Sequence, residues 1–215
     1  MDSQYWKQKW EKGETQFHLD APHPMLVRYF SKAPARKVMV PLCGKSNDLV
    51  WLRAQGHEVV GVELSALACE AFFTENKIAF QKRQVGSAVV FQGERVTLWC
   101  GDFFEIPKSA WEGCTAVYDR AALIALPEEI RAKYARHIIQ NVTQSSMLLV
   151  TVEYQSGQLI GPPYSVSEEE IHSLYGKSFE IERLESRRDE GLSNRPPKFT
   201  GIEVTEKVFR LTQKK

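Results

Sequence analysis

The stretch VPLCGKSNDL, residues 40–49, decides how this sequence is interpreted, because it joins an apolar run to a helix-like segment through a glycine turn. Its GKS tripeptide, at 44–46, has the ending of a nucleotide-binding P-loop. A P-loop also has a glycine five positions before its Gly-Lys pair, so that successive backbone N–H groups surround a phosphate. Met39 stands at that position, and Pro41 has no N–H to donate. The stretch therefore predicts a strand-to-helix turn that serves a different ligand.

The segments on either side of this turn alternate between strand and helix patterns. We expect strands at 37–42, 57–64, 96–100, 115–119 and 147–154, helices at 46–55, 65–76, 127–142 and 167–176, and two late strands at 179–186 and 200–212 that pair antiparallel. The less regular stretch 80–94 could hold extra short strands. Repeated strand–helix alternation with short turns predicts the α/β class, with a doubly wound, mostly parallel sheet and an antiparallel C-terminal strand. We interpret 1–215 as one domain, with a lid at 1–30 and the α/β core at 31–215.

Composition indicates an ordinary soluble globular protein, with 43% hydrophobic and 26% charged residues. The 28 basic and 27 acidic residues give a formal net charge of +1, which argues against nucleic-acid binding. Four cysteines without CxxC spacing, and no cluster at metal-ligand spacing, predict free thiols and no metal site. No run is apolar enough for a membrane span, and the N-terminal stretch does not have the pattern of a signal peptide. We therefore expect a cytoplasmic protein.

Polar residues stand where the expected strands end, which is the edge at which open α/β sheets bind ligands. Gly44 follows the first strand and would let a ligand approach the backbone closely. Glu63 ends the second strand, 19 positions later (63 − 44). An acidic residue at about that separation hydrogen-bonds the ribose hydroxyls of an adenosine-containing cofactor. Asp102 follows a third strand and could meet an adenine edge, with Phe103 against the ring.

Arg120 ends a fourth strand, in the sequence VYDRAAL. Each of these positions also has a plainer explanation, since Glu63 could be a surface acid, Asp102 could cap a turn and Arg120 could form an ion pair. Their joint placement at successive strand ends favours a binding site.

A dinucleotide site would show the G-x-G-x-x-G pattern, which PLCGKSNDL does not contain. An adenosine cofactor without phosphates, S-adenosyl-L-methionine, fits these residues better.

Five blocks of sequence carry a resemblance to a known family. In chain order they are the W-x-x-x-W…FH segment at 6–18, PLCGKSNDL at 41–49, GVELS at 61–65, YDRAAL at 118–123 and GPPYSVSEEEI at 161–171. Together they resemble the thiopurine S-methyltransferase family over nearly the whole chain. The resemblance implies a class I methyltransferase fold with an N-terminal helical lid. It also implies methyl transfer from S-adenosyl-L-methionine to aromatic and heterocyclic thiols, with S-adenosyl-L-homocysteine as the product.

The resemblance and the strand-end positions together assign the site residues. The candidate cofactor-binding residues are Trp6, Trp10, Phe17, Leu42, Gly44, Glu63, Leu64, Asp102, Phe103 and Arg120. Within this set, Trp6 and Phe17 match the segment that closes over the cofactor in the family. The resemblance also places Arg195, in the loop SNRPPK, near the substrate mouth. Arg120 and Arg195 are therefore candidates for orienting the substrate.

Methyl transfer from a sulfonium to a thiolate is an in-line displacement. It needs two aligned sulfur centres shielded from water more than it needs an acid or base. We find no Ser-His-Asp or Cys-His arrangement and assign no certain catalytic residue. Trp6 and Trp10 would share one side of a short N-terminal helix and could face the sulfonium, although they could instead anchor that helix. His18 and His23 flank this lid and are interpreted as structural residues.

Other functions compete with thiol methylation. A methyltransferase of the same fold could act on selenium or tellurium species or another small acceptor, as loops at 17–25, 155–165 and 190–200 would decide. A non-catalytic S-adenosylmethionine-binding protein would not need the aromatic lid. The missing glycine pattern disfavours an NAD-dependent oxidoreductase, and nucleic-acid methylation lacks its N-P-P-[YF] motif. The expected partner is a small-molecule thiol, with no nucleic acid and no membrane, and the expected state is a monomer.

Overall fold

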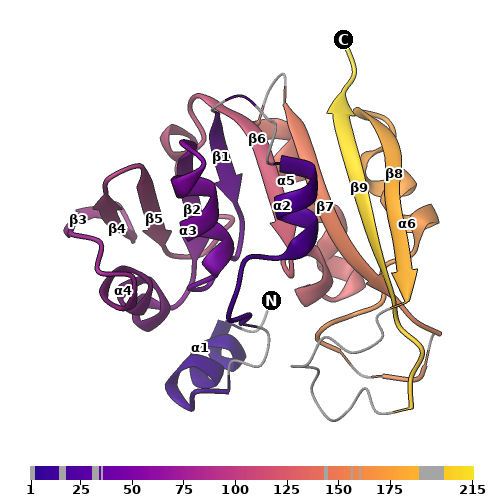
Figure 1. Ribbon diagram of the computed structural model, residues 1–215, viewed down its shortest axis with the longest axis horizontal. Helices are drawn as coiled ribbons and strands as arrows, with labels where there is room; N and C mark the ends of the chain where they lie inside the picture. Colours follow the sequence, from indigo (N-terminus) through magenta and orange to yellow (C-terminus); the bar gives the residue numbers. More distant parts are fainter. Residues whose placement is uncertain are drawn as a thin grey trace. The chain divides into compact units, whose positions relative to one another are not determined.

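A computed structural model describes residues 3–14, 18–30, 34, 36–142, 145–155, 157–159, 161–188 and 201–215. Within these residues the chain forms two compact units, and the division falls inside strand β6 (Cys114–Arg120). Val117 ends the first unit and Tyr118 begins the second. Figure 1 colours both units along the sequence. The interpretation of 1–215 as one domain stays a prediction.

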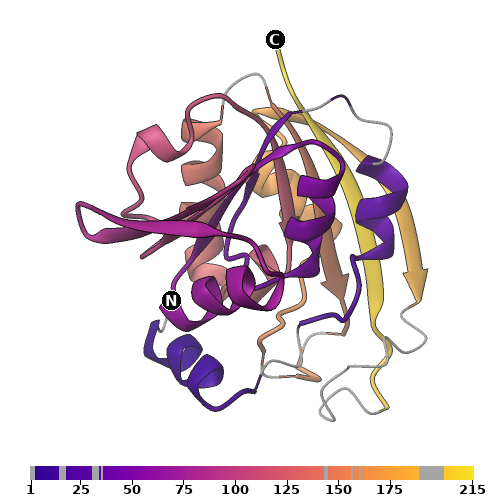
Figure 2. The ribbon, with the colours of Figure 1, turned by 60° about the vertical axis from the view of Figure 1, so that its left-hand side comes forward.

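The strands of the first unit follow the order β3-β4-β5-β2-β1-β6. Their bounds are Lys37–Val40 (β1), Glu58–Glu63 (β2), Phe80–Val85 (β3), Ala88–Gly93 (β4) and Val96–Cys100 (β5). Strand β1 pairs in parallel with β2 and with the first half of β6, and β2 pairs in parallel with β5. The β3–β4 hairpin is antiparallel and projects at the left of Figure 2. The parallel strands therefore bring several carboxyl ends to one edge, as the sequence predicts.

The helices of the first unit are α1 (Ser3–Glu11), α2 (Pro24–Phe30), α3 (Asn47–Ala54) and α4 (Ala66–Glu75), with a short 3₁₀ turn at Lys108–Ala110. Serine hydroxyls cap two of them. The Ser46 hydroxyl accepts a hydrogen bond from the Asp48 amide at 3.2 Å, and the Ser65 hydroxyl accepts one from the Ala68 amide at 3.3 Å. Each cap satisfies an amide that lacks a partner inside its helix. Helix α2 is not among the sequence-based expectations.

Strand β2 is buried on both faces, and its valines fit that environment. Gly61 in its middle has no room for a side chain. A Cβ atom there would lie 2.5 Å from Cδ2 of Leu98 and 2.6 Å from Sγ of Cys43. Glycine therefore allows the turn after β1 to pack closely on the strand that ends at Glu63.

The second unit contains strands β7 (Ser146–Glu153), β8 (Phe179–Arg188) and β9 (Thr205–Gln213), helices α5 (Glu128–Asn141) and α6 (Glu168–Tyr175), and a short 3₁₀ turn at Leu123–Ala125. Strand β9 lies antiparallel between β7 and β8 (Figure 1). The Ser167 hydroxyl caps α6 by accepting a hydrogen bond from the Glu170 amide at 3.2 Å. Pro127 is the N-cap of α5 and not its first helical residue, because its ψ of 153° is extended.

The α/β class, the parallel central strands with their helices and the antiparallel C-terminal strand are confirmed. The stretch 80–94 does hold short strands, and they add an antiparallel hairpin to the sheet. Among the described residues, no helix combines the length and hydrophobicity that a membrane crossing requires. The fold therefore places a row of strand ends where the sequence analysis expects the ligand.

Candidate functional site

Glu63 is the last residue of β2, and its side chain accepts hydrogen bonds from two segments at the carboxyl ends of the parallel strands. One carboxylate oxygen accepts a bond from the Gly44 amide at 2.9 Å, and the other accepts one from the Ser65 amide at 2.8 Å. The side chain is only 6% exposed. Burial raises the pKa of Glu63, while the amide hydrogen bonds act in the opposite direction. The carboxylate therefore holds the turn after β1 and the start of α4 in fixed positions.

The geometry of this carboxylate fits an adenosine cofactor. An ionised carboxylate has about four lone-pair sites, and the two backbone amides occupy one on each oxygen. Each carboxylate oxygen can accept more than one hydrogen bond, which suits a ribose with its two neighbouring hydroxyls. The residues present thus fit the ribose of S-adenosylmethionine, and Glu63 is the residue that would hold it.

The structure also explains why GKS at 44–46 is not a P-loop. The Gly44 amide, which would donate to a phosphate in such a loop, donates to Glu63 instead. The Lys45 ammonium lies 2.6 and 2.8 Å from the two carboxylate oxygens of Glu75, near the end of α4. Both phosphate-binding groups therefore have protein partners.

The turn after β1 carries two further candidates, and Leu64 lies beside Glu63. Leu42 has a φ of 47° and Gly44 a φ of 54°, so the turn contains two left-handed residues, one of which has a side chain. The Cys43 amide donates to the Val62 carbonyl at 2.9 Å and attaches the turn to β2. Leu42 and Leu64 are half-buried. These residues therefore lie around Glu63, as their positions in the sequence predict.

Asp102 and Phe103 follow β5, next to the same edge. The Gly101 amide donates to the Glu63 backbone carbonyl at 2.9 Å, so this segment starts beside the ribose candidate. Asp102 is exposed, and its carboxylate accepts a hydrogen bond from the Phe104 amide at 2.9 Å, which is a turn-capping contact. Phe103 is 2% exposed and packs edge-on against Trp111, with 5.6 Å between ring centroids. Phe103 thus serves the core, and its role against an adenine stays a prediction.

A helix, α1, forms in the segment predicted to be a lid and packs against α4, while its role as a lid stays a prediction. Trp6 and Trp10 are half-buried and one helical turn apart, whereas Tyr5 on the neighbouring face is 38% exposed. Trp6 packs edge-on against Tyr5, with ring centroids 5.3 Å apart. Both tryptophans are therefore less exposed than Tyr5, as residues on one side of the helix would be.

Two polar residues at the start of α3, missed by the sequence analysis, attach the segment that follows the lid. The Asn47 side-chain amide donates to the Leu19 carbonyl at 2.8 Å. The Asp48 carboxylate, which is buried, accepts a hydrogen bond from the His23 amide at 2.7 Å. His23 is itself buried, and its ring nitrogen Nδ1 accepts from the Met25 amide at 3.3 Å, which supports its structural interpretation. A polar side chain directly after a helix cap is the sequence signal for such an attachment.

In the second unit, β6 ends with Asp119 and Arg120, whose side chains alternate between the two faces of the strand. Asp119 is fully buried, and its carboxylate accepts hydrogen bonds from the Tyr134 hydroxyl at 2.7 Å and the Leu123 amide at 3.1 Å. Burial raises the pKa of Asp119 to about 6. Arg120 is half-buried, and Ala121 after it has a φ of 63°. Asp119 thus anchors the left-handed turn that presents Arg120.

Two candidates, Phe17 and Arg195, lie outside the described residues, as does the loop expected at 190–200. Among the residues that the structure does describe, no group of three or more His, Cys, Asp or Glu side chains could hold a metal ion. The described part of the candidate site therefore consists of the Glu63 hydrogen bonds, the turn at 42–44, the segment at 101–103 and the lid.

Comparison with known proteins identifies the family. The family model described as thiopurine S-methyltransferase matches residues 1–214. A thiopurine S-methyltransferase of Bordetella petrii is 38% identical over 218 residues, covering 98% of each chain. Another, of Pseudomonas fluorescens strain Pf0-1, is 40% identical and covers 98% of this chain and 99% of the relative.

Solved structures agree on the fold. Magnesium protoporphyrin IX methyltransferase from Synechocystis, crystallised with S-adenosylmethionine, matches with a TM-score of 0.66 and 13% identity, covering 100% of this chain and 98% of the other. The shared fold and the two full-length relatives indicate an S-adenosylmethionine-dependent methyltransferase. This chain belongs to the thiopurine S-methyltransferase family.

Proposed function

We propose that this protein transfers the methyl group of S-adenosylmethionine to the sulfur of aromatic or heterocyclic thiols such as thiopurines. The observation that carries the proposal is the buried Glu63 carboxylate at the end of β2, which the Gly44 and Ser65 amides hold in place at the edge where a ribose is expected. The names of the full-length relatives support a thiol as the acceptor. The net charge of +1 supports a small molecule over a nucleic acid.

The cofactor supplies an activated methyl group when it is bound, and the protein has to orient the two reactants and exclude water. In this proposal Glu63 holds the ribose, and Leu42, Gly44 and Leu64 shape the wall beside it. Trp10 offers an aromatic face to the sulfonium, a contact that favours a cation. Trp6 helps to close the lid over the site and keeps water out.

The acceptor thiol needs no strong base, because aromatic thiols ionise readily. The carboxylate of Asp119 does not serve as one, since it is fully buried and both its oxygens accept hydrogen bonds within the second unit. Arg120 and Arg195 are proposed to attract the thiolate or the cofactor carboxylate. Charge attraction and alignment therefore carry the reaction, which we propose takes place in a monomer.

The test is a calorimetric titration of the purified protein with S-adenosyl-L-homocysteine, followed by a methyl-transfer assay with thiophenol in the same sample. We expect micromolar binding and methylation of the thiol. Binding without turnover on thiophenol, together with turnover on selenite or tellurite, would move the acceptor to those species. Absence of binding would contradict the ribose assignment of Glu63.

A second prediction concerns the lid. Trp10→Ala should weaken S-adenosylmethionine binding roughly five- to thirtyfold, because a desolvated cation–aromatic contact contributes on the order of 1–2 kcal/mol. S-adenosylhomocysteine is uncharged at sulfur, so its loss of affinity should be smaller. Titration with both ligands measures the difference.

Gln8→Ala is the matched control, because Gln8 is an exposed residue on the same helix. It should leave both affinities unchanged. If Trp10→Ala lowers the unfolding temperature by several degrees and affects both ligands equally, Trp10 anchors the helix and does not contact the sulfonium.

A further inference from the structure

Tyr154 directly follows β7 and precedes 155–165, one of the loops that the sequence analysis associates with the choice of acceptor. Its side chain is 8% exposed, and its hydroxyl donates a hydrogen bond to the Pro163 carbonyl at 2.9 Å. Its main chain bonds to the same stretch, because the Ser165 hydroxyl accepts from the Tyr154 amide and donates to the Tyr154 carbonyl, both at 3.0 Å. Three hydrogen bonds therefore join Tyr154 to the segment 161–165.

The ring of Tyr154 also belongs to a small apolar cluster that includes a second part of the chain. Val204 is the other buried member, and Val152, Leu159 and Ile202 pack against the two. Leu159 belongs to the first acceptor loop, whereas Ile202 and Val204 stand directly before β9, just after the other expected acceptor loop of this unit. The cluster therefore connects the first acceptor loop with the residues that lead into β9.

The segment that Tyr154 holds is bonded in turn to the residues after Arg120. The Tyr164 amide donates to the Ile124 carbonyl at 2.7 Å. Ile124 lies in the 3₁₀ turn that follows the left-handed Ala121. Hydrogen bonds and one short piece of chain thus connect Tyr154 to the turn that presents Arg120, the residue proposed to attract the thiolate.

Tyr164 is fixed from another side by Arg131, which is 3% exposed. The guanidinium carbon lies 5.7 Å from the centre of the Tyr164 ring, and Nε donates to the Leu126 carbonyl at 2.9 Å. Nη1 also donates to both carboxylate oxygens of Glu170, at 2.9 and 2.7 Å. Tyr164 is therefore held against helices α5 and α6, and the hydroxyl of Tyr154 sets the position of its segment relative to β7.

We propose that Tyr154 is a positioning residue for the acceptor thiol, whose hydroxyl and ring keep the loop at 155–165, the approach to β9 and Arg120 in one arrangement. The inference rests on the proposed function, because an in-line displacement depends on how accurately the acceptor is oriented. A thiopurine has two fused rings and reaches more of such a surface than the single ring of thiophenol. The arrangement should therefore matter more for the larger thiol.

Tyr154→Phe tests the proposal, because it removes the hydroxyl and keeps the ring in the apolar cluster. Initial rates at saturating S-adenosylmethionine give kcat and KM for 6-mercaptopurine and for thiophenol, and titration gives the affinity for S-adenosylhomocysteine. We expect kcat/KM for 6-mercaptopurine to fall roughly three- to tenfold, the effect of one net hydrogen bond. The fall should be smaller for thiophenol, and the cofactor affinity should not change.

Hydrogen exchange measures the attachment itself, separately from turnover. In Tyr154→Phe, peptides that cover 161–166 and 121–126 should exchange faster than in the unmodified protein. The reason is that the Tyr164 amide and the Ile124 carbonyl join these two stretches, so that loosening one increases the local opening of the other.

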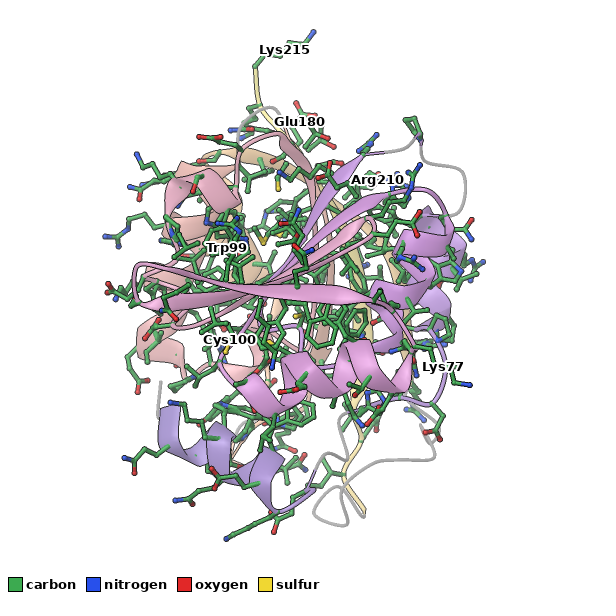
Figure 3. All side chains as sticks on the ribbon, turned by 90° about the vertical axis from the view of Figure 1, so that its left-hand side faces the viewer. Lys77, Trp99, Cys100, Glu180, Arg210 and Lys215 are labelled. Atoms are coloured by element: carbon green, nitrogen blue, oxygen red, sulfur yellow. The ribbon has the colours of Figure 1, made fainter. Side chains whose placement is uncertain are left out.

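Two variants provide controls. Tyr175→Phe matches the substitution, because Tyr175 is fully buried in the same unit and its hydroxyl has no hydrogen-bond partner among the described residues. Arg210→Gln tests β9 away from Val204, since Arg210, labelled in Figure 3, lies further along that strand and pairs with Glu182 at 2.9 Å. Both variants should keep the acceptor preference and the exchange rate at 121–126.

The outcomes separate the role of Tyr154 from the proposed function. An equal loss of kcat/KM for the two thiols, or no loss, overturns its role in acceptor choice, and weaker S-adenosylhomocysteine binding assigns it to the cofactor instead. Unchanged exchange at 121–126 overturns the connection to Arg120. If the unmodified protein binds S-adenosylhomocysteine but methylates neither thiol, the proposed function fails together with the acceptor role, while hydrogen exchange still decides the attachment.

Discussion

Glu63→Ala should weaken S-adenosylhomocysteine binding by about 1–3 kcal/mol, which is roughly five- to 150-fold in the dissociation constant. The substitution removes the charged acceptor proposed for both ribose hydroxyls. It also leaves the Gly44 and Ser65 amides without the acceptor they have in the folded protein. We therefore expect a lower unfolding temperature as well, since unsatisfied buried amides are destabilising. Calorimetric titration and thermal unfolding measure the two effects.

Glu58→Ala provides the matched control for this experiment. Glu58 is the same residue type at the opposite, exposed end of β2. It should change neither affinity nor stability by more than about 0.5 kcal/mol. If Glu63→Ala lowers the unfolding temperature but leaves the affinity intact, the carboxylate only holds the turn at Gly44, and the ribose assignment is wrong.

The second large effect concerns Asp119, whose pKa is raised by burial to about 6 from an ordinary value of 3.8. The folded state thus binds a proton at pH values where the unfolded state has lost it. The contribution of Asp119 to the free energy of unfolding is therefore highest below about pH 4 and is lost as the pH rises through 6. Two pKa units correspond to about 3 kcal/mol. Urea unfolding between pH 4.5 and 7.5 measures it.

Asp119→Asn removes the titration and keeps the shape of the side chain. Its carbonyl oxygen can still accept from the Leu123 amide, and its NH₂ group can donate to the Tyr134 oxygen. Relative to the unmodified protein, the variant should therefore gain stability as the pH rises from 4.5 to 7.5. Asp20→Asn, at an exposed position, should show no such trend. A stability difference between Asp119→Asn and the unmodified protein that stays constant with pH would contradict the buried ionisation.

Much of the fold can be predicted because the signals are local. The serine caps at 46 and 65 and the valine-rich run before Glu63 place α3, β2 and α4 correctly. Helix α2 was missed because Pro24–Phe30 is barely two turns long, too short for a clear period. The N-cap position of Pro127 depends on a single ψ angle, which no residue pattern specifies.

The site was predictable to the extent that it depends on strand ends. The position of Glu63 and its distance from Gly44 along the chain pointed to their neighbourhood, although not to the hydrogen bond between them. The contact from Tyr134 to Asp119 joins a helix to a strand 15 residues away, and sequence alone gives no means of pairing them. The inward packing of Phe103 against Trp111 likewise depends on tertiary structure.

The left-handed backbone at Leu42 and at Ala121 has a consequence for laboratory evolution. A non-glycine residue in such a conformation costs on the order of 1–3 kcal/mol. A library selected only for heat tolerance should therefore enrich glycine or asparagine at both positions, since these residues adopt that conformation most easily. A library selected for methyl transfer would keep leucine and alanine if their side chains contribute to catalysis. Sequencing the two pools would show, for each turn, whether its left-handed leucine or alanine is needed for methyl transfer or only lowers the stability of the fold.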